Sequence, residues 1–180
     1  MLPTNPADAK GLLKTAIRCD DPVLFLEHKN LLSVKGPVPD GEYLVPFGQA
    51  AIARPGEHVT VVGIAYTVWQ ALQAAEELSK EGISVEVIDP RTLAPLDIDT
   101  ILASVHKTGR LLIVDEDFSP CGVAAEIAMQ VMERGFDDLD APVKRLNGLF
   151  CPAPYSPALS EGIVPTTRSI LQAIRDLLAE

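Results

Sequence analysis

The sequence lacks the features that mark several common functional classes. It has only three cysteines, none of them in a C-x-x-C pair: Cys19, Cys121 and Cys151. This spacing indicates neither a zinc site nor a disulfide framework, so we expect reduced thiols. Aromatic residues make up only 5% of the chain, whereas hydrophobic residues reach 47%. A chain of 180 residues with this composition can bury a sizeable core, in one domain or in one domain plus a fragment.

Long apolar runs and an excess of basic charge are absent too. Runs such as Leu111 to Val114 are far shorter than the roughly 20 residues that cross a bilayer, and the first ten residues do not resemble a signal peptide. We therefore expect a cytoplasmic protein. The 25 acidic and 15 basic residues give a net charge of −10, which repels nucleic acid and anionic membranes. A basic protein partner fits this charge, and solubility alone also explains it.

Catalytic motifs are missing as well. The chain has no GxGxxG or GxxxxGKS phosphate cradle, and no Ser, His or Cys stands in a nucleophile arrangement. The carboxylates of Asp115 to Asp117 are consecutive, and side chains that leave a strand in succession point different ways, which disfavours a metal site. The histidines are scattered, and none has an evident partner for nucleophilic or metal chemistry: His28, His58 and His106. We predict no catalytic, cofactor-binding or metal-binding residue in this chain.

Hydrophobic periodicity predicts an alternation of strands and helices. Continuous apolar runs predict four strands, at 58–65, 84–89, 110–116 and 142–146. Helical spacing predicts helices at 67–80, from Asp97 to Gly109, at 122–135, and from Thr166 or Thr167 to Leu178. The order βαβαβαβα indicates an α/β fold: a three-layer α/β/α sandwich around a mostly parallel sheet.

The first 42 residues follow a different pattern. Asn5 followed by Pro6 predicts a helix start, and Asp20-Asp21-Pro22 predicts its end. Residues 23–27 are predicted to form a buried strand. The Gly- and Pro-rich stretch Lys35–Gly41 predicts a surface loop and a domain boundary.

The stretch VIDPRTLAPLD, at 87–97, poses the main question of function. It follows a predicted strand, and ligands of open parallel sheets usually bind beyond the carboxyl ends of the strands. A structural role explains the same residues, because Pro90 and Pro95 fix the backbone direction, Arg91 supplies up to five donors and Asp97 caps the next helix.

Several motifs together resemble a known family. VIDPRTLAPLD, KTGRL at 107–111, AAEIA at 124–128 and CPAPYSP at 151–157 are similar to the C-terminal domain of the transketolase superfamily. More narrowly, the chain resembles the beta subunit of the thiamine diphosphate-dependent decarboxylating component of 2-oxo acid dehydrogenase complexes. The residues that we assign to structural motifs on this basis are Asp89, Arg91, Thr92, Asp97, Glu116, Gly122 and Glu126.

The resemblance implies a division of the chain. Residues 1–34 are similar to the last helix and strand of a pyrimidine-binding domain, residues 35–42 to a linker, and residues 43–180 to the transketolase C-terminal domain. Thiamine diphosphate and magnesium then belong to the complete enzyme, and this chain alone is expected neither to bind them nor to catalyse. Two departures concern loops: Ala65 and Cys121 stand where relatives often have glycine.

The resemblance also implies partners: an alpha subunit, a second beta subunit and the basic subunit-binding domain of the acyltransferase component. We predict that the last of these docks on an acidic group and, within it, favour Asp140: Asp137, Asp138, Asp140 and Glu180. Two other functions remain open. One is a non-catalytic binding module with a ligand at the strand ends, and the other is a part of a transketolase-like carbon-transfer enzyme.

Overall fold

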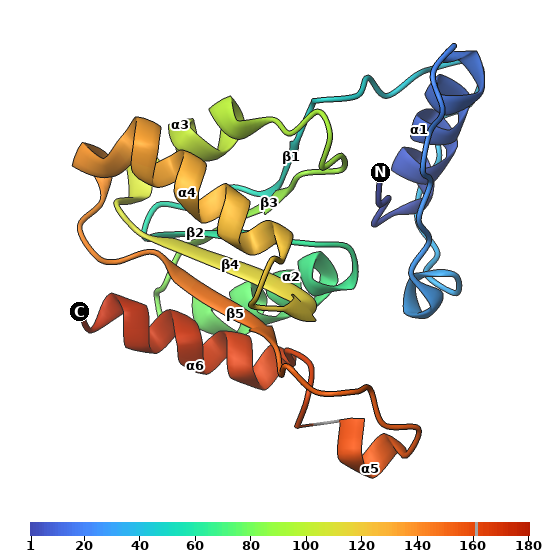
Figure 1. Ribbon diagram of the computed structural model, residues 1–180. Helices are drawn as coiled ribbons and strands as arrows, with labels where there is room; N and C mark the ends of the chain where they lie inside the picture. The colour runs from blue at the N-terminus through green and yellow to red at the C-terminus, as the bar shows by residue number, and fades with distance from the viewer. Residues whose placement is uncertain (161) are drawn as a thin grey trace.

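The computed structural model describes residues 1–160 and 162–180. Its centre is one sheet with the strand order β1-β3-β2-β4-β5 (Figure 1). Four of these strands run parallel, and β1 pairs antiparallel with β3 at one edge. The strands are β1 Ala51–Arg54, β2 Val59–Gly63, β3 Val85–Asp89, β4 Leu111–Phe118 and β5 Lys144–Gly148.

Helices cover both faces of this sheet, as Figure 1 shows. One face carries α2 (Tyr66–Ser79) and α6 (Thr167–Leu178), and the other carries α3 (Ile98–Thr108) and α4 (Val123–Gly135). Leu112 packs in the core under the first pair and Ile113 in the core under the second. Because alternate residues of β4 face opposite layers, both must be apolar. The predicted three-layer α/β/α sandwich is therefore confirmed.

The helix ends follow local signals in the sequence. The Asn5 side chain accepts a hydrogen bond of 2.9 Å from the Asp8 N–H at the start of α1 (Pro6–Arg18). Asp97 caps α3 by accepting from the Thr100 N–H, and Thr166 caps α6. Gly109 ends α3 at a φ of 67°, a conformation that glycine adopts without strain. These predicted caps are confirmed.

Residues 1–46 form an N-terminal segment beside the sandwich. Figure 1 shows α1 apart from the sheet, on the side to which the parallel strands point. The segment also holds one turn of 3-10 helix, η1 (Lys29–Leu31). Two further short elements follow along the chain: η2 (Phe136–Asp138) directly after α4, and α5 (Pro157–Ser160), which Figure 1 shows outside the sandwich. Within the described residues, no helix has the length and apolar content of a membrane span.

Two features of the sheet differ from the sequence prediction. Residues 23–27 form no strand and are not a buried run, since Leu24 is 79% and Leu26 is 52% exposed, so that prediction was wrong. Their backbone contacts Met1: the Met1 ammonium donates to the Leu24 carbonyl at 2.8 Å and the Leu26 N–H donates to the Met1 carbonyl at 3.0 Å. The antiparallel strand β1 was not predicted. It has four residues with no clear alternation, and its pairing depends on the free edge of β3.

Candidate functional site

The N-terminal segment lies across the carboxyl ends of the parallel strands, where a ligand of an open α/β sheet would bind. Three contacts between side chains hold it there. Thr4 Oγ1 donates to Asp89 Oδ2 at the end of β3, and Arg91 forms an ion pair with Asp8. At the end of β4, His28 Nε2 lies 2.7 Å from Glu116 Oε2. The chain thus uses its own side chains to occupy this edge of the sheet.

Asp89 is the most deeply buried carboxylate of this contact, with 2% of its surface exposed. It also accepts a hydrogen bond of 2.8 Å from the Arg91 N–H. Burial raises the pKa of Asp89 to about 6, and Asp8 adds to the rise, whereas the hydrogen bonds from Thr4 and Arg91 oppose it. The Asp89 carboxyl group therefore changes charge in a mildly acidic pH range. Because it accepts one hydrogen bond from Thr4 and one from the Arg91 backbone, its role is structural.

Arg91 joins the stretch 87–97 to α1. Its guanidinium forms a bidentate pair with Asp8, with Nε 3.0 Å from Oδ2 and Nη2 2.7 Å from Oδ1. Its carbonyl accepts from the Leu2 N–H at 2.9 Å, and its φ of 61° lies in the left-handed region. These contacts on both the side chain and the backbone hold a strained residue in place.

Thr92 and Asp97 fix the segment that enters β1. Thr92 Oγ1 accepts from the Gly48 N–H at 2.9 Å and donates to the Pro95 carbonyl at 2.7 Å. Asp97 Oδ2 accepts from the Ala50 N–H at 2.9 Å while the same carboxylate caps α3. Burial acts to raise the pKa of Asp97, but these hydrogen bonds outweigh it and the pKa lies below its usual range. The contacts of 87–97 are those of a structural corner.

The histidines have structural partners that the sequence did not reveal. His28 stacks on Tyr66, with ring centroids 5.1 Å apart, in addition to its contact with Glu116. His58 Nδ1 accepts from the Ser84 N–H at 3.0 Å. His106 Nδ1 lies 2.7 Å from Asp138 Oδ1. These partners lie 26 or more residues away in the sequence, beyond the reach of local patterns. His28 Nδ1 in addition accepts from the nearby Asn30 N–H at 3.2 Å.

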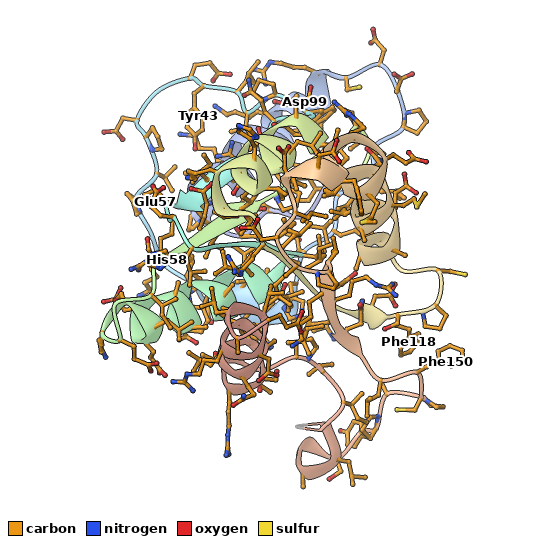
Figure 2. The ribbon with its side chains drawn as sticks, turned by 90° about the vertical axis from the view of Figure 1, so that its left-hand side faces the viewer. Tyr43, Glu57, His58, Asp99, Phe118 and Phe150 are labelled. Atoms are coloured by element: carbon orange, nitrogen blue, oxygen red, sulfur yellow. The ribbon has the colours of Figure 1, made fainter. Side chains whose placement is uncertain are left out.

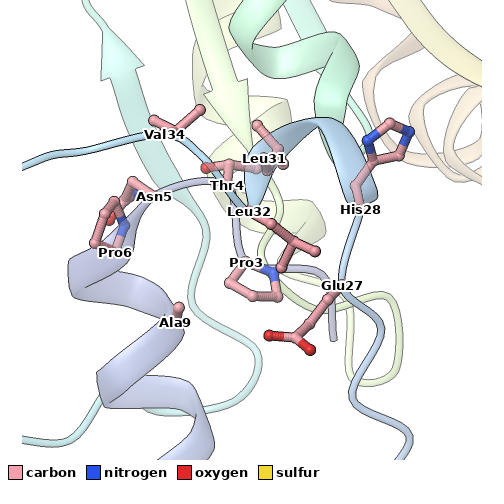
Figure 3. Close-up of a pocket in the computed structure, with 10 residues that line it drawn as sticks. All are labelled: Pro3, Thr4, Asn5, Pro6, Ala9, Glu27, His28, Leu31, Leu32 and Val34. Carbon is pink, nitrogen blue, oxygen red and sulfur yellow. The ribbon is translucent and has the colours of Figure 1, made fainter.

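A cavity of about 230 Å³ lies inside the N-terminal segment, between the start of α1 and η1 (Figure 3). Its walls are mostly apolar or proline side chains. Figure 3 shows that Glu27 and His28, the charged or titratable members of the lining, point in different directions. This arrangement offers no pair of groups for acid–base chemistry.

Other predicted motif residues lie around the start of α4. An added Cβ at Gly122 would collide with the Phe118 carbonyl, so glycine is required for this close approach. Glu126 lies in the first turn of α4 and accepts from Gln130 at 2.8 Å. Asp115 is buried, burial raises its pKa, and its Oδ2 has no hydrogen-bond partner among the described residues. Its Oδ1 accepts from the Asp117 N–H at 3.1 Å, and the charges of Asp117 and Glu116 add to the rise of its pKa.

The two departures from glycine both adopt positive φ. Ala65, between β2 and α2, has a φ of 53°, and Cys121, before α4, has a φ of 60°. Non-glycine residues adopt this conformation at a cost in strain. The loops keep the shape that glycine would favour, so the sequence departures alter side chains rather than the path of the chain.

The acidic docking residues are only partly brought together. Asp138 is paired with His106, and Asp140 Oδ2 lies 3.7 Å from Arg110 Nη1 with its side chain 68% exposed. The Asp140 N–H donates to the Gly109 carbonyl at 2.7 Å. No contact among the described residues joins Glu180 to Asp137 or its neighbours.

The described residues do not fit a metal-held diphosphate. They contain no group of three or more His, Cys, Asp or Glu side chains that would hold a metal ion. The carboxylates at the strand ends are engaged with Thr4, Arg91 and His28 instead. We therefore derive no chemical step through thiamine diphosphate in this chain.

Comparisons with known proteins agree with the fold. The family model of the transketolase C-terminal domain matches residues 48–170. The chain is 46% identical over 180 residues to the acetoin:2,6-dichlorophenolindophenol oxidoreductase subunit beta of Bacillus subtilis (strain 168), covering 100% of the chain and 53% of that protein. It is 44% identical over 177 residues to the mitochondrial pyruvate dehydrogenase E1 component subunit beta of Dictyostelium discoideum, covering 96% and 50%.

A solved structure has the same fold. It is described as a split gene transketolase, inactive beta4 tetramer, and it matches with a TM-score of 0.84 at 24% identity, covering 99% of this chain and 57% of that one. The fold and the strand-end contacts define an α/β sandwich domain that is closed by its own N-terminal segment. The chain belongs to the transketolase C-terminal domain family, as its motifs indicated. It spans about half the length of the curated relatives it matches, along their C-terminal half.

Proposed function

We propose that the chain is the C-terminal part of the beta subunit of the decarboxylating component of a 2-oxo acid dehydrogenase complex. Its role there is subunit assembly and docking, and the chemistry lies in other domains. The family match and the beta-subunit relatives support this assignment. The observation that carries the role is the occupied strand edge, where Thr4, Asp8 and His28 take the positions that a ligand would need.

In this proposal the partners are an alpha subunit, a second beta subunit and the basic subunit-binding domain of an acyltransferase component. The exposed end of α4 supports a docking role. Met132 and Phe136 line a groove of about 500 Å³ together with Asp140, and Phe136 is 62% exposed. An apolar groove with a carboxylate at its rim suits a partner that presents apolar and basic side chains. Thiamine diphosphate and magnesium bind to the complete assembly, through residues of the other domains.

Isothermal titration tests the assignment. Thiamine diphosphate with Mg²⁺ is titrated into this chain alone, and then into this chain mixed with the pyrimidine-binding half and the alpha subunit of a related acetoin-oxidising enzyme. We expect no binding to the chain alone, and binding to the mixture together with co-elution in gel filtration. Tight binding by the chain alone contradicts the proposal, and so does failure of the mixture to assemble.

A further inference from the structure

The outer edge of β5 has unpaired backbone groups. The Leu149 N–H, just beyond the strand, points away from β4 and donates to the Ile163 carbonyl at 2.8 Å. Because backbone groups of a strand alternate in direction, the N–H and C=O groups of Arg145 and Asn147 point to this same outer side. Among the described residues, neither has a backbone partner there. The edge is therefore open along β5 as far as Asn147.

The carboxyl end of this edge is closed. Besides the Leu149 contact, Phe118 and Phe150 pack edge to face at this end, with ring centroids 5.4 Å apart, and Figure 2 shows the two rings beside each other. An added strand would therefore be limited to the stretch that starts at Lys144 and ends at Asn147.

A groove of about 670 Å³ runs beside the open edge, between β5 and α6. Its apolar lining consists of Leu146, Leu171 and Ala173. Figure 1 shows β5 at the border of the sheet with α6 next to it. A second chain that paired with β5 would place alternate side chains on this apolar lining.

Cations surround the edge in a chain whose net charge is −10. Arg168, in the first turn of α6, is exposed and forms no ion pair among the described residues. Lys144 lies 3.4 Å from Asp176, on the α6 side of the sheet. Arg145 is exposed on the opposite side and donates to the Ser119 carbonyl at 3.4 Å. The local excess of positive charge favours carboxylates.

We propose that β5 binds an extended acidic segment of another protein, which pairs with Arg145 and Asn147 as a sixth strand. Its apolar side chains lie on Leu146 and Leu171, and its alternating carboxylates face Arg145 on the opposite side. Carboxylates at its two ends contact Lys144 and Arg168, which lie beside opposite ends of α6. A second copy of this chain is the less suitable occupant, because an antiparallel pair of β5 edges would bring both sets of these cations to one seam. The inference does not depend on the proposed function.

The test measures fluorescence anisotropy of a labelled ten-residue peptide that alternates valine with glutamate and has an extra glutamate at each end. Two comparison peptides replace every glutamate by lysine or every second valine by proline, which removes backbone donors. Arg168→Glu tests the charge. Arg145→Pro tests the outward N–H, Arg145→Ala separates that effect from the loss of charge, and Lys35→Glu is the matched control on the linker.

We expect the acidic peptide to bind in a salt-dependent manner, and Arg168→Glu and Arg145→Pro to weaken binding by about 10-fold or more. Arg145→Ala should weaken it less than Arg145→Pro, and Lys35→Glu should change it by less than about 2-fold. Circular dichroism checks that each variant is folded. The inference is overturned if the peptide does not bind, if the proline or lysine peptide binds equally well, or if folded variants bind like the parent. Sedimentation that shows a dimer which Arg145→Pro dissociates would assign the edge to a second copy instead.

Discussion

Glu86 is a buried carboxylate of the sandwich that is paired with a lysine. It is 1% exposed, and it accepts from the Lys107 ammonium and, at 3.1 Å, from the Gly56 N–H. Burial acts to raise the pKa of Glu86, but the hydrogen bonds from Lys107, Ser104 and Gly56 outweigh it and the pKa lies below its usual range. Lys107 belongs to the KTGRL motif, and this contact gives the motif a physical role.

Lys107→Met is expected to lower the free energy of unfolding by about 2 kcal/mol. The loss is smaller than the ~3–5 kcal/mol of a fully buried pair because the Lys107 side chain is 36% exposed. Urea unfolding at pH 7 measures it. The double variant Lys107→Met with Glu86→Gln should recover part of the lost stability, because no unpaired charge remains buried. Lys80→Met, at the exposed end of α2, is the control. If Lys107→Met is as stable as the parent, the ion pair with Lys107 does not stabilise the buried carboxylate of Glu86.

Asp89 predicts a pH effect of defined sign. Its pKa is raised from 3.8 to about 6, so the folded state binds this proton more tightly than the unfolded state does. Stability from this group is full below about pH 4 and is lost as the pH rises through 6, by up to about 1.4 kcal/mol per pH unit. Asp89→Asn should remove this dependence. Urea unfolding of both proteins between pH 4 and 7 gives the difference, and a difference that stays constant across the range would refute the assignment.

At the scale of helices and strands, the sequence predicts what local signals determine. The caps at Asn5, Asp97 and Thr166 and the left-handed Gly109 depend on neighbours within four residues, and the structure has all of them. Elements that need a distant partner were not predictable. The contact of Arg91 with Asp8 spans 83 residues of sequence, and the pairing of β1 depends on the edge of β3. In the corner at 87–97, local signals predicted the cap at Asp97 but not the contact of Arg91 with Asp8.

Asp97 combines the two kinds of signal, because one carboxylate caps α3 and also accepts from the Ala50 N–H that leads into β1. Asp97→Ala should lower the free energy of unfolding by about 1–2 kcal/mol, as loss of a helix cap does, and should expose the Ala50 amide to exchange. Asp97→Asn keeps an oxygen acceptor and should lose less. Thermal unfolding measures the loss of stability, and hydrogen exchange measures the exposure of the Ala50 amide. An alanine variant as stable as the asparagine variant would contradict the capping role.

At the scale of the whole molecule, charge and apolar surface are distributed unevenly. The edge of β5 is cationic, whereas the turn after α4 carries three aspartates beside the exposed Phe136. Although the net charge is −10, the molecule therefore has one surface that favours acidic partners and another that favours basic partners. Because the two surfaces lie on different elements, an acidic and a basic partner would not compete for the same contacts.

The acidic surface yields the prediction that bears on assembly. Asp138 is engaged with His106, whereas Asp140 is 68% exposed, its N–H is fixed by the Gly109 carbonyl, and it lines the groove beside Met132. The 3.7 Å distance between Asp140 and Arg110 is longer than a charge-assisted hydrogen bond. A Lys or Arg side chain of a partner that reaches hydrogen-bonding distance can therefore replace Arg110.

Asp140→Ala should weaken binding of the basic subunit-binding domain of a cognate acyltransferase component by about 30-fold, which is the scale of a ~2 kcal/mol charge contact. The association rate should fall most, and the difference from the parent should shrink between low and moderate salt, because steering by exposed charges is screened. Surface plasmon resonance at two salt concentrations measures both effects. Asp20→Ala, an equal change of charge at the end of α1, is the control. If Asp140→Ala and Asp20→Ala bind alike and neither shows a salt effect, the docking surface lies on another part of the molecule.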